Sequence, residues 1–142
     1  MAGDQLSVAS QGRVARIFDL TGHLTTPAPN CRRLLQITFG ELEVVNAMGL
    51  RVFRREVSPA QAESALSEFE KDLRDGVFQL RGLTDPILER AQQLSRQTAG
   101  KLGTRTADLL HVAAALELGV DCIYSFDLHQ RKLAQTLRLK LN

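Results

Sequence analysis

Apolar positions along this chain follow two different spacings, which alternate from residue 33 to the end. Short apolar runs predict buried strands. These strands are expected at 34–37, 77–80, 122–126 and 137–141. Between them, apolar residues three and four positions apart predict amphipathic helices. The helices are expected at 38–55, 59–75, 85–99, 104–119 and 128–136. Because strands that alternate with helices form βαβ units, the pattern predicts a single α/β domain over residues 1–142, with a parallel sheet covered on both faces.

Three of the predicted helices begin with capping signals. Thr38 and Glu41 have the spacing of a capping box, in which each side chain bonds the other residue's backbone N–H. Ser58 and Gln61 repeat that spacing, with a proline at the first helical position. Thr104 is expected to cap a later helix. The pattern thereby assigns Glu41 a structural role.

The first 33 residues lack the strand-like apolar runs found in the rest of the chain. Their most apolar stretch, Val14–Leu20, fits a helical pattern better than a strand. We therefore expect no strand before Leu34.

Composition and cysteine use limit the class of protein. The chain is 44% hydrophobic and 24% charged, which is ordinary for a soluble globular protein. No apolar stretch reaches the roughly 18 residues of a transmembrane helix, and no secretory signal pattern is visible. The two cysteines, Cys31 and Cys122, form neither a disulfide framework nor a zinc motif. We expect a cytoplasmic protein that does not contact membranes.

The charges are unevenly distributed, although the net charge is only +2. Residues 108–127 carry four acids and no Lys or Arg, and basic segments flank them at 76–107 and 128–142. A solvated surface would explain this pattern by itself. Metal-dependent phosphodiester chemistry requires the same pattern, because carboxylates hold the cation and basic side chains hold the phosphates.

Three acids occupy positions where the functional residues of an open parallel sheet gather, beyond the carboxyl ends of its strands. Glu43 follows the strand at 34–37, Asp127 follows the strand at 122–126, and Asp108 opens the helix between them. Taken singly, each has a structural explanation: a helix surface for Glu43, the helix dipole for Asp108 and an N-cap for Asp127. Taken together, three like charges at one edge favour a bound cation, and oxygen ligands suit Mg²⁺ or Mn²⁺.

Other chemistries find little support. The histidines His23, His111 and His129 do not have metal-ligand spacing, and His111 is expected to be packed or hydrogen-bonded. The sequence contains no glycine-rich phosphate loop and no nucleophile elbow.

Three segments, in this order and spacing, resemble the PIN domain family, and more narrowly its VapC-like toxin branch. They are Glu43–Ala47, Thr104–Gly119 and Tyr124–Asp127. The resemblance runs from about Leu34 to the C-terminus. It implies a three-layer α/β/α Rossmann-like fold with a central parallel sheet.

The resemblance also implies an activity, namely Mg²⁺- or Mn²⁺-dependent hydrolysis of phosphodiester bonds in RNA. Glu43, Asp108 and Asp127 match the metal-binding and catalytic acids of the family, and Ser125 matches a hydroxyl position near the metal. Toxin members form homodimers and are inhibited by a cognate antitoxin, here expected to be a VapB-like protein that blocks the acidic groove. The basic residues proposed to hold the RNA strand are Arg105, Arg131 and Lys132.

The sequence departs from the family at its N-terminus. PIN domains begin with a central strand that ends in a further aspartate, whereas Asp4 and Asp19 are the only acids in residues 1–33 and neither aligns with that position. Residues 1–33 are therefore expected to be an atypical or truncated segment. One alternative is a catalytically impaired PIN-like module that binds RNA or a protein. Another is a Mg²⁺-dependent phosphoryl-transfer enzyme such as a phosphatase, which needs a nucleophilic aspartate after the first strand.

Overall fold

The computed structural model of the chain describes residues 14–16, 34–120, 122–125 and 127–141. Its strands form a parallel sheet in the order β3-β2-β1-β4-β5. They are β1 (Val14–Arg16), β2 (Leu34–Ile37), β3 (Phe78–Arg81), β4 (Cys122–Tyr124) and β5 (Lys140–Leu141). Because parallel neighbours are joined by crossover connections, helices separate the strands from β2 onward.

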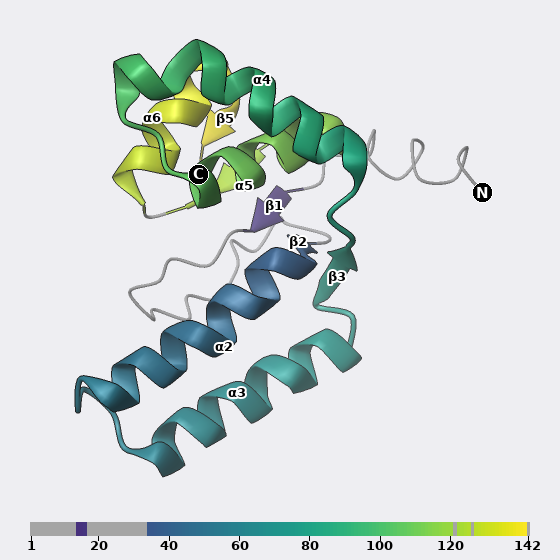
Figure 1. Cartoon of the computed structure of the whole chain (residues 1–142). Coiled ribbons are helices and arrows are strands. Elements are labelled where there is room, and N and C mark those ends of the chain that lie inside the picture. The colour runs from purple at the N-terminus through teal and green to yellow at the C-terminus, as the bar shows by residue number, and fades with distance from the viewer. Residues whose placement is uncertain (1–13, 17–33, 121, 126, 142) are drawn as a thin grey trace.

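The helices gather in two groups on opposite sides of the strands (Figure 1). They are α2 (Thr38–Phe53), α3 (Pro59–Arg74), α4 (Asp85–Leu102), α5 (Thr106–Glu117) and α6 (Leu128–Thr136). Helix α2 packs on α3, whereas α5 packs on both α4 and α6. Within the described ranges, no helix has the length and apolar character needed to cross a membrane. The chain thus has a mostly helical α/β structure with a small parallel sheet.

Strand β1 corrects the expectation that no strand precedes Leu34. Val14 pairs in parallel with Leu34 of β2 on one side and with Cys122 of β4 on the other, so β1 lies at the centre of the sheet. The helix expected over Val14–Leu20 is therefore wrong for residues 14–16, and 17–20 lie outside the described residues. So short a strand is stabilised by hydrogen bonds to the neighbouring strand on each side. The apolar content of the segment itself does not reveal such neighbours.

Helix α5 runs through the main core. All of its residues from 108 to 115 are buried, and Val112 and Ala113 are fully buried. A helix that is buried on every side must be covered by other elements all round. Two of its buried residues, Asp108 and His111, are polar and therefore need partners inside the protein. A second, smaller core joins α2, α3 and β3 through Val44, Phe69 and Phe78.

Of the capping signals at Thr38, Ser58 and Thr104, the helix termini confirm one and correct two. Ser58 and Gln61 form the expected capping box at the start of α3. The box predicted for Thr38 and Glu41 is absent, because β2 passes directly into α2 and Ile37 is the N-cap residue. Glu41 therefore has no capping role. The cap of α5 is likewise not the expected Thr104 but the next residue, Arg105.

Candidate active site

Asp108 sits in the first turn of α5 with only 2% of its surface exposed. Its Oδ2 accepts hydrogen bonds from the backbone N–H of Arg105 (3.2 Å) and from the Arg105 Nε–H (3.0 Å). Its Oδ1 accepts from Arg105 Nη2 at 3.3 Å, so the guanidinium holds both carboxylate oxygens. Paired and hydrogen-bonded in this way, the carboxylate tolerates a degree of burial that an isolated charge would not.

Asp127 is the N-cap of α6, as the sequence predicted. Its Oδ1 accepts from the backbone N–H groups of His129 (2.8 Å) and Gln130 (3.3 Å). Partial burial alone would raise the pKa of Asp127, but the hydrogen bonds from Arg105 and from those N–H groups outweigh it and lower the pKa. Ser125, which is 1% exposed, accepts the backbone N–H of Asp127 through its Oγ at 3.1 Å. Ser125 therefore fixes the chain from which Asp127 projects.

Arg105 links the two aspartates. The same Nη2 that bonds Asp108 lies 2.5 Å from Oδ2 of Asp127. The hydrogen bonds that Arg105 donates to Asp108 and then to Asp127 raise the pKa of Arg105, so it remains charged. One cationic nitrogen therefore lies between two carboxylates that are 19 positions apart in the sequence.

Glu43 reaches α5 from the opposite group of helices. Its Oε2 bonds Nε2 of His111, which lies 68 positions along the chain. His111 is 3% exposed and its ring lies 5.8 Å from that of Phe39, centroid to centroid. Asp108 and His111 are three positions apart on α5 and so share a helix face. The contact therefore holds Glu43 one helical turn along α5 from Asp108.

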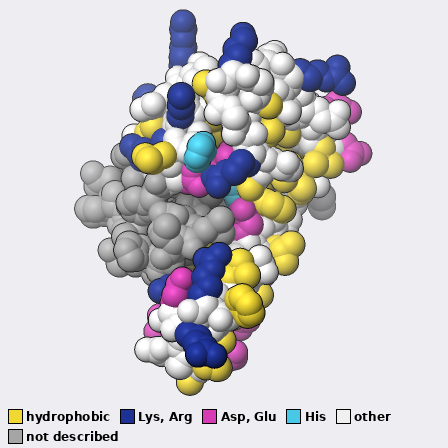
Figure 2. Space-filling model, turned by 60° about the vertical axis from the view of Figure 1, so that its left-hand side comes forward, with side chains coloured by type: hydrophobic (Ala, Val, Ile, Leu, Met, Phe, Trp, Pro, Cys, Tyr) yellow, Lys and Arg dark blue, Asp and Glu magenta, His cyan; other side chains and the backbone are white. Residues whose placement is uncertain are grey.

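A cleft of about 500 Å³ begins at Glu43 and follows α2. Its described lining residues are Glu43, Asn46, Ala47, Leu50, Arg51, Arg54 and Glu56. Arg51 pairs with Glu56 (3.3 Å) rather than with Glu43. Acidic, basic and histidine side chains lie near one another on the face shown in Figure 2. Of the candidate acids, Glu43 therefore lines this cleft.

Residues 32–135 match the family model of the PIN domain. The chain belongs to the PIN domain family. PIN domains are nucleases, which supports a nuclease-like function for this chain. The matched segment contains all four predicted site residues, Glu43, Asp108, Ser125 and Asp127, whereas β1 precedes it. No curated protein shows a significant match to the chain.

PIN nucleases typically use divalent metals, and the two aspartates of this PIN domain fit such an ion in part. Asp108 and Asp127 already share one positive charge, and their oxygens are the donors that Mg²⁺ and Mn²⁺ prefer. Glu43 instead has His111 as its partner. Across the described ranges, no group of three or more His, Cys, Asp or Glu side chains is arranged to hold a metal. The residues that fit a divalent ion are therefore Asp108 and Asp127, and the Arg105 guanidinium lies between their carboxylates.

The sequence did not predict the contacts that Arg105 and His111 make with these acids. Arg105 was expected to hold RNA, yet its bonds are to Asp108 and Asp127. His111 is packed and hydrogen-bonded as expected, but its partner Glu43 comes from a distant helix. Only the spacing of three, which places Asp108 three positions after the N-cap Arg105 and His111 one turn later on α5, could have indicated that these residues lie together.

Proposed function

We propose that this PIN domain is a Mg²⁺- or Mn²⁺-dependent endoribonuclease of the VapC-like toxin type that acts on cytoplasmic RNA. The observation that carries the proposal is the pairing of Asp108 and Asp127 around a single cationic nitrogen. Two carboxylates this close favour a shared cation, and the family supplies the nuclease chemistry. The arrangement of α2 and α3 opposite α4, α5 and α6 (Figure 1) supports the three-layer Rossmann-like sandwich that we propose for the fold.

Asp108 and Asp127 would hold the ion, with Glu43 as a further acid nearby. A bound divalent ion lowers the pKa of a water molecule and neutralises charge that builds on the phosphate. The chain's own residues orient these acids: Ser125 and the N-terminal N–H groups of α6 position Asp127, and His111 positions Glu43. The exposed Lys132 of α6 is available to bind the RNA backbone.

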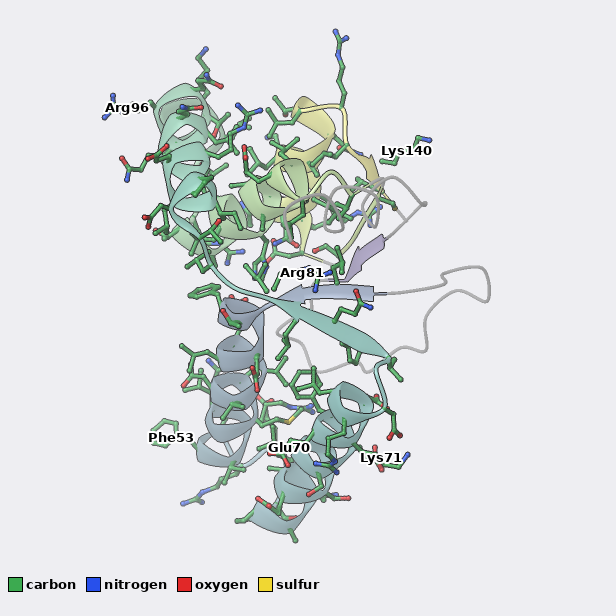
Figure 3. The ribbon with its side chains drawn as sticks, turned by 90° about the vertical axis from the view of Figure 1, so that its right-hand side faces the viewer. Phe53, Glu70, Lys71, Arg81, Arg96 and Lys140 are labelled. Carbon is green, nitrogen blue, oxygen red and sulfur yellow. The ribbon has the colours of Figure 1, made fainter. Side chains whose placement is uncertain are left out.

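The toxin assignment includes two protein contacts, a homodimer and a VapB-like antitoxin. An exposed apolar stripe on α2 supports a protein contact of this kind. The exposed fractions there are 62% for Leu42, 48% for Val45 and 83% for Phe53. Phe53 points away from the body of the protein in Figure 3. Clusters of exposed apolar side chains commonly mark interaction surfaces. The proposed homodimer predicts a mass of twice 15.7 kDa by light scattering.

A catalytically impaired binding module is the second candidate function. It is favoured by the fact that each acid already has a partner inside the protein: Arg105 for the two aspartates and His111 for Glu43. It is also favoured by the sequence, because neither Asp4 nor Asp19 aligns with the first metal-binding aspartate of the family. Strand β1 supplies the central strand, but both of these acids lie outside the described residues.

RNA cleavage with and without divalent ions separates the two candidates. We expect the wild-type chain to cleave single-stranded RNA in Mg²⁺ or Mn²⁺, and EDTA to abolish cleavage. Asp108→Asn should reduce the rate at least about a hundredfold, because it removes one of the charges that hold the ion. Asp75→Asn is the matched control, since Asp75 is exposed at the end of α3 and pairs only with Lys71 among the described residues.

The outcomes distinguish the candidates. Cleavage that survives Asp108→Asn would remove this site from the proposal. RNA binding without cleavage, by the wild-type chain in either metal, would favour the binding module.

A further inference from the structure

Arg105 makes more charged contacts with the candidate acids than any other described residue. Its side chain donates Nε–H to Asp108 and uses Nη2 for both Asp108 and Asp127. The guanidinium therefore lies where a cation shared by the two carboxylates would lie. An Arg⁺ and a divalent ion cannot both occupy this place, since like charges repel strongly over a few ångström.

The guanidinium can leave without dismantling the site. The Arg105 side chain is 53% exposed, whereas the side chain of Asp108 is 3% exposed. Each aspartate also has backbone donors that do not depend on the guanidinium. Asp108 retains the N–H of Arg105, and Asp127 retains the N-terminal N–H groups of α6. Rotation of one long surface side chain would leave both carboxylates in position.

We propose that Arg105 is a built-in counter-ion which a divalent cation must displace from Asp108 and Asp127 before it binds. Resting on the proposed nuclease function, this assigns Arg105 a regulatory part in the same site: it stabilises the metal-free acids and sets the metal concentration at which the site fills. A positioned guanidinium lowers the affinity for Mg²⁺ or Mn²⁺ because its charge-assisted bonds must be broken first.

Mn²⁺ binding to the full chain, measured by titration calorimetry, tests this without an activity assay. Arg105→Gln should bind Mn²⁺ at least about tenfold more tightly than the wild type, because a hydrogen bond between charged groups exceeds the 1.4 kcal/mol that a factor of ten requires. Arg105→Lys should lie between the two, because a single ammonium cannot reproduce the forked contacts of a guanidinium. Arg96→Gln is the matched control, since Arg96 is exposed on α4 and points away from the protein in Figure 3.

Thermal unfolding provides the second readout. Without metal, Arg105→Gln should melt below the wild type, because the buried Asp108 loses its counter-charge. Mn²⁺ should then raise the melting temperature of Arg105→Gln more than that of the wild type. Arg96→Gln should behave as the wild type in both measurements.

Failure of this inference and failure of the proposed function give different results. If Asp108→Asn abolishes Mn²⁺ binding but Arg105→Gln binds no more tightly than the wild type, the displacement idea is wrong and the metal site stands. If neither the wild type nor Arg105→Gln binds Mn²⁺ at millimolar concentration, both ideas are wrong. If Arg105→Gln does not fold, the Mn²⁺ affinity of Arg105→Lys relative to the wild type provides the same test.

Discussion

The bond between Glu43 and His111 offers a sharp test of how the site is held together. It joins α2 to α5, from helix groups on opposite sides of the sheet. His111→Phe removes both ring nitrogens while keeping an aromatic ring against Phe39. Glu43→Ala removes the carboxylate. We expect these two substitutions to be strongly coupled in a double-mutant cycle.

The magnitude follows from burial and charge. The side chains of His111 and Glu43 are 3% and 16% exposed, so water competes weakly for their bond. Hydrogen bonds to charged groups are worth about 1.5–3 kcal/mol, and we expect a coupling free energy in that range. The single His111→Phe change should cost less, about 0.5–2 kcal/mol. The reason is that it also removes Nδ1, which is buried without a hydrogen-bond partner among the described residues.

Urea unfolding of the wild type, the two single variants and the double variant measures the coupling. The exposed pair Lys71 and Asp75, taken through a parallel cycle, is the control and should show a much smaller coupling because both groups are solvated. A coupling below about 0.5 kcal/mol for Glu43 and His111 would refute the reasoning, since it would mean that the two groups act independently.

Three further predictions concern stability and are checked by urea unfolding. Ser58→Ala should cost about 1 kcal/mol by removing the capping box of α3, whereas Thr38→Ala should cost less because Thr38 caps nothing. Gly103→Ala should cost about 1–2 kcal/mol because Gly103 has φ +63°, a left-handed conformation that alanine adopts poorly. Gly100→Ala should instead stabilise by about 0.5–1 kcal/mol, because Gly100 lies in helical backbone and an added Cβ meets no other atom at either glycine. Equal effects of the two substitutions would contradict the conformational argument. Leu133→Ala should cost about 2–5 kcal/mol because Leu133 is fully buried, and a loss below 1 kcal/mol would place it outside the core.

Local patterns predicted the elements that are long or strongly periodic. The strand at 34–37 and the helix at 128–136 have the predicted bounds, and the other elements from β3 onward differ mainly at their ends. Periodicity succeeds here because one face of each helix must be apolar to be buried. Helix starts were predicted less well, because a capping residue is optional where a strand leads directly into the helix, as at Ile37.

Strand β1 shows what local pattern misses. Its three residues carry too little sequence to distinguish a strand from a helix, and its stability comes from β2 and β4 on either side. Those neighbours lie at least 18 and 106 positions away in the chain. Non-local pairing of this kind overrides weak local preferences.

The sequence by itself determined which acids this PIN domain carries and at which ends of its helices and strands they stand. Only the tertiary structure decided their partners: Arg105 for Asp108 and Asp127, and His111 for Glu43. The physical reason is that helical spacing specifies which residues share a face, whereas packing specifies which faces meet. The charge state and accessibility of the site depend on that second choice.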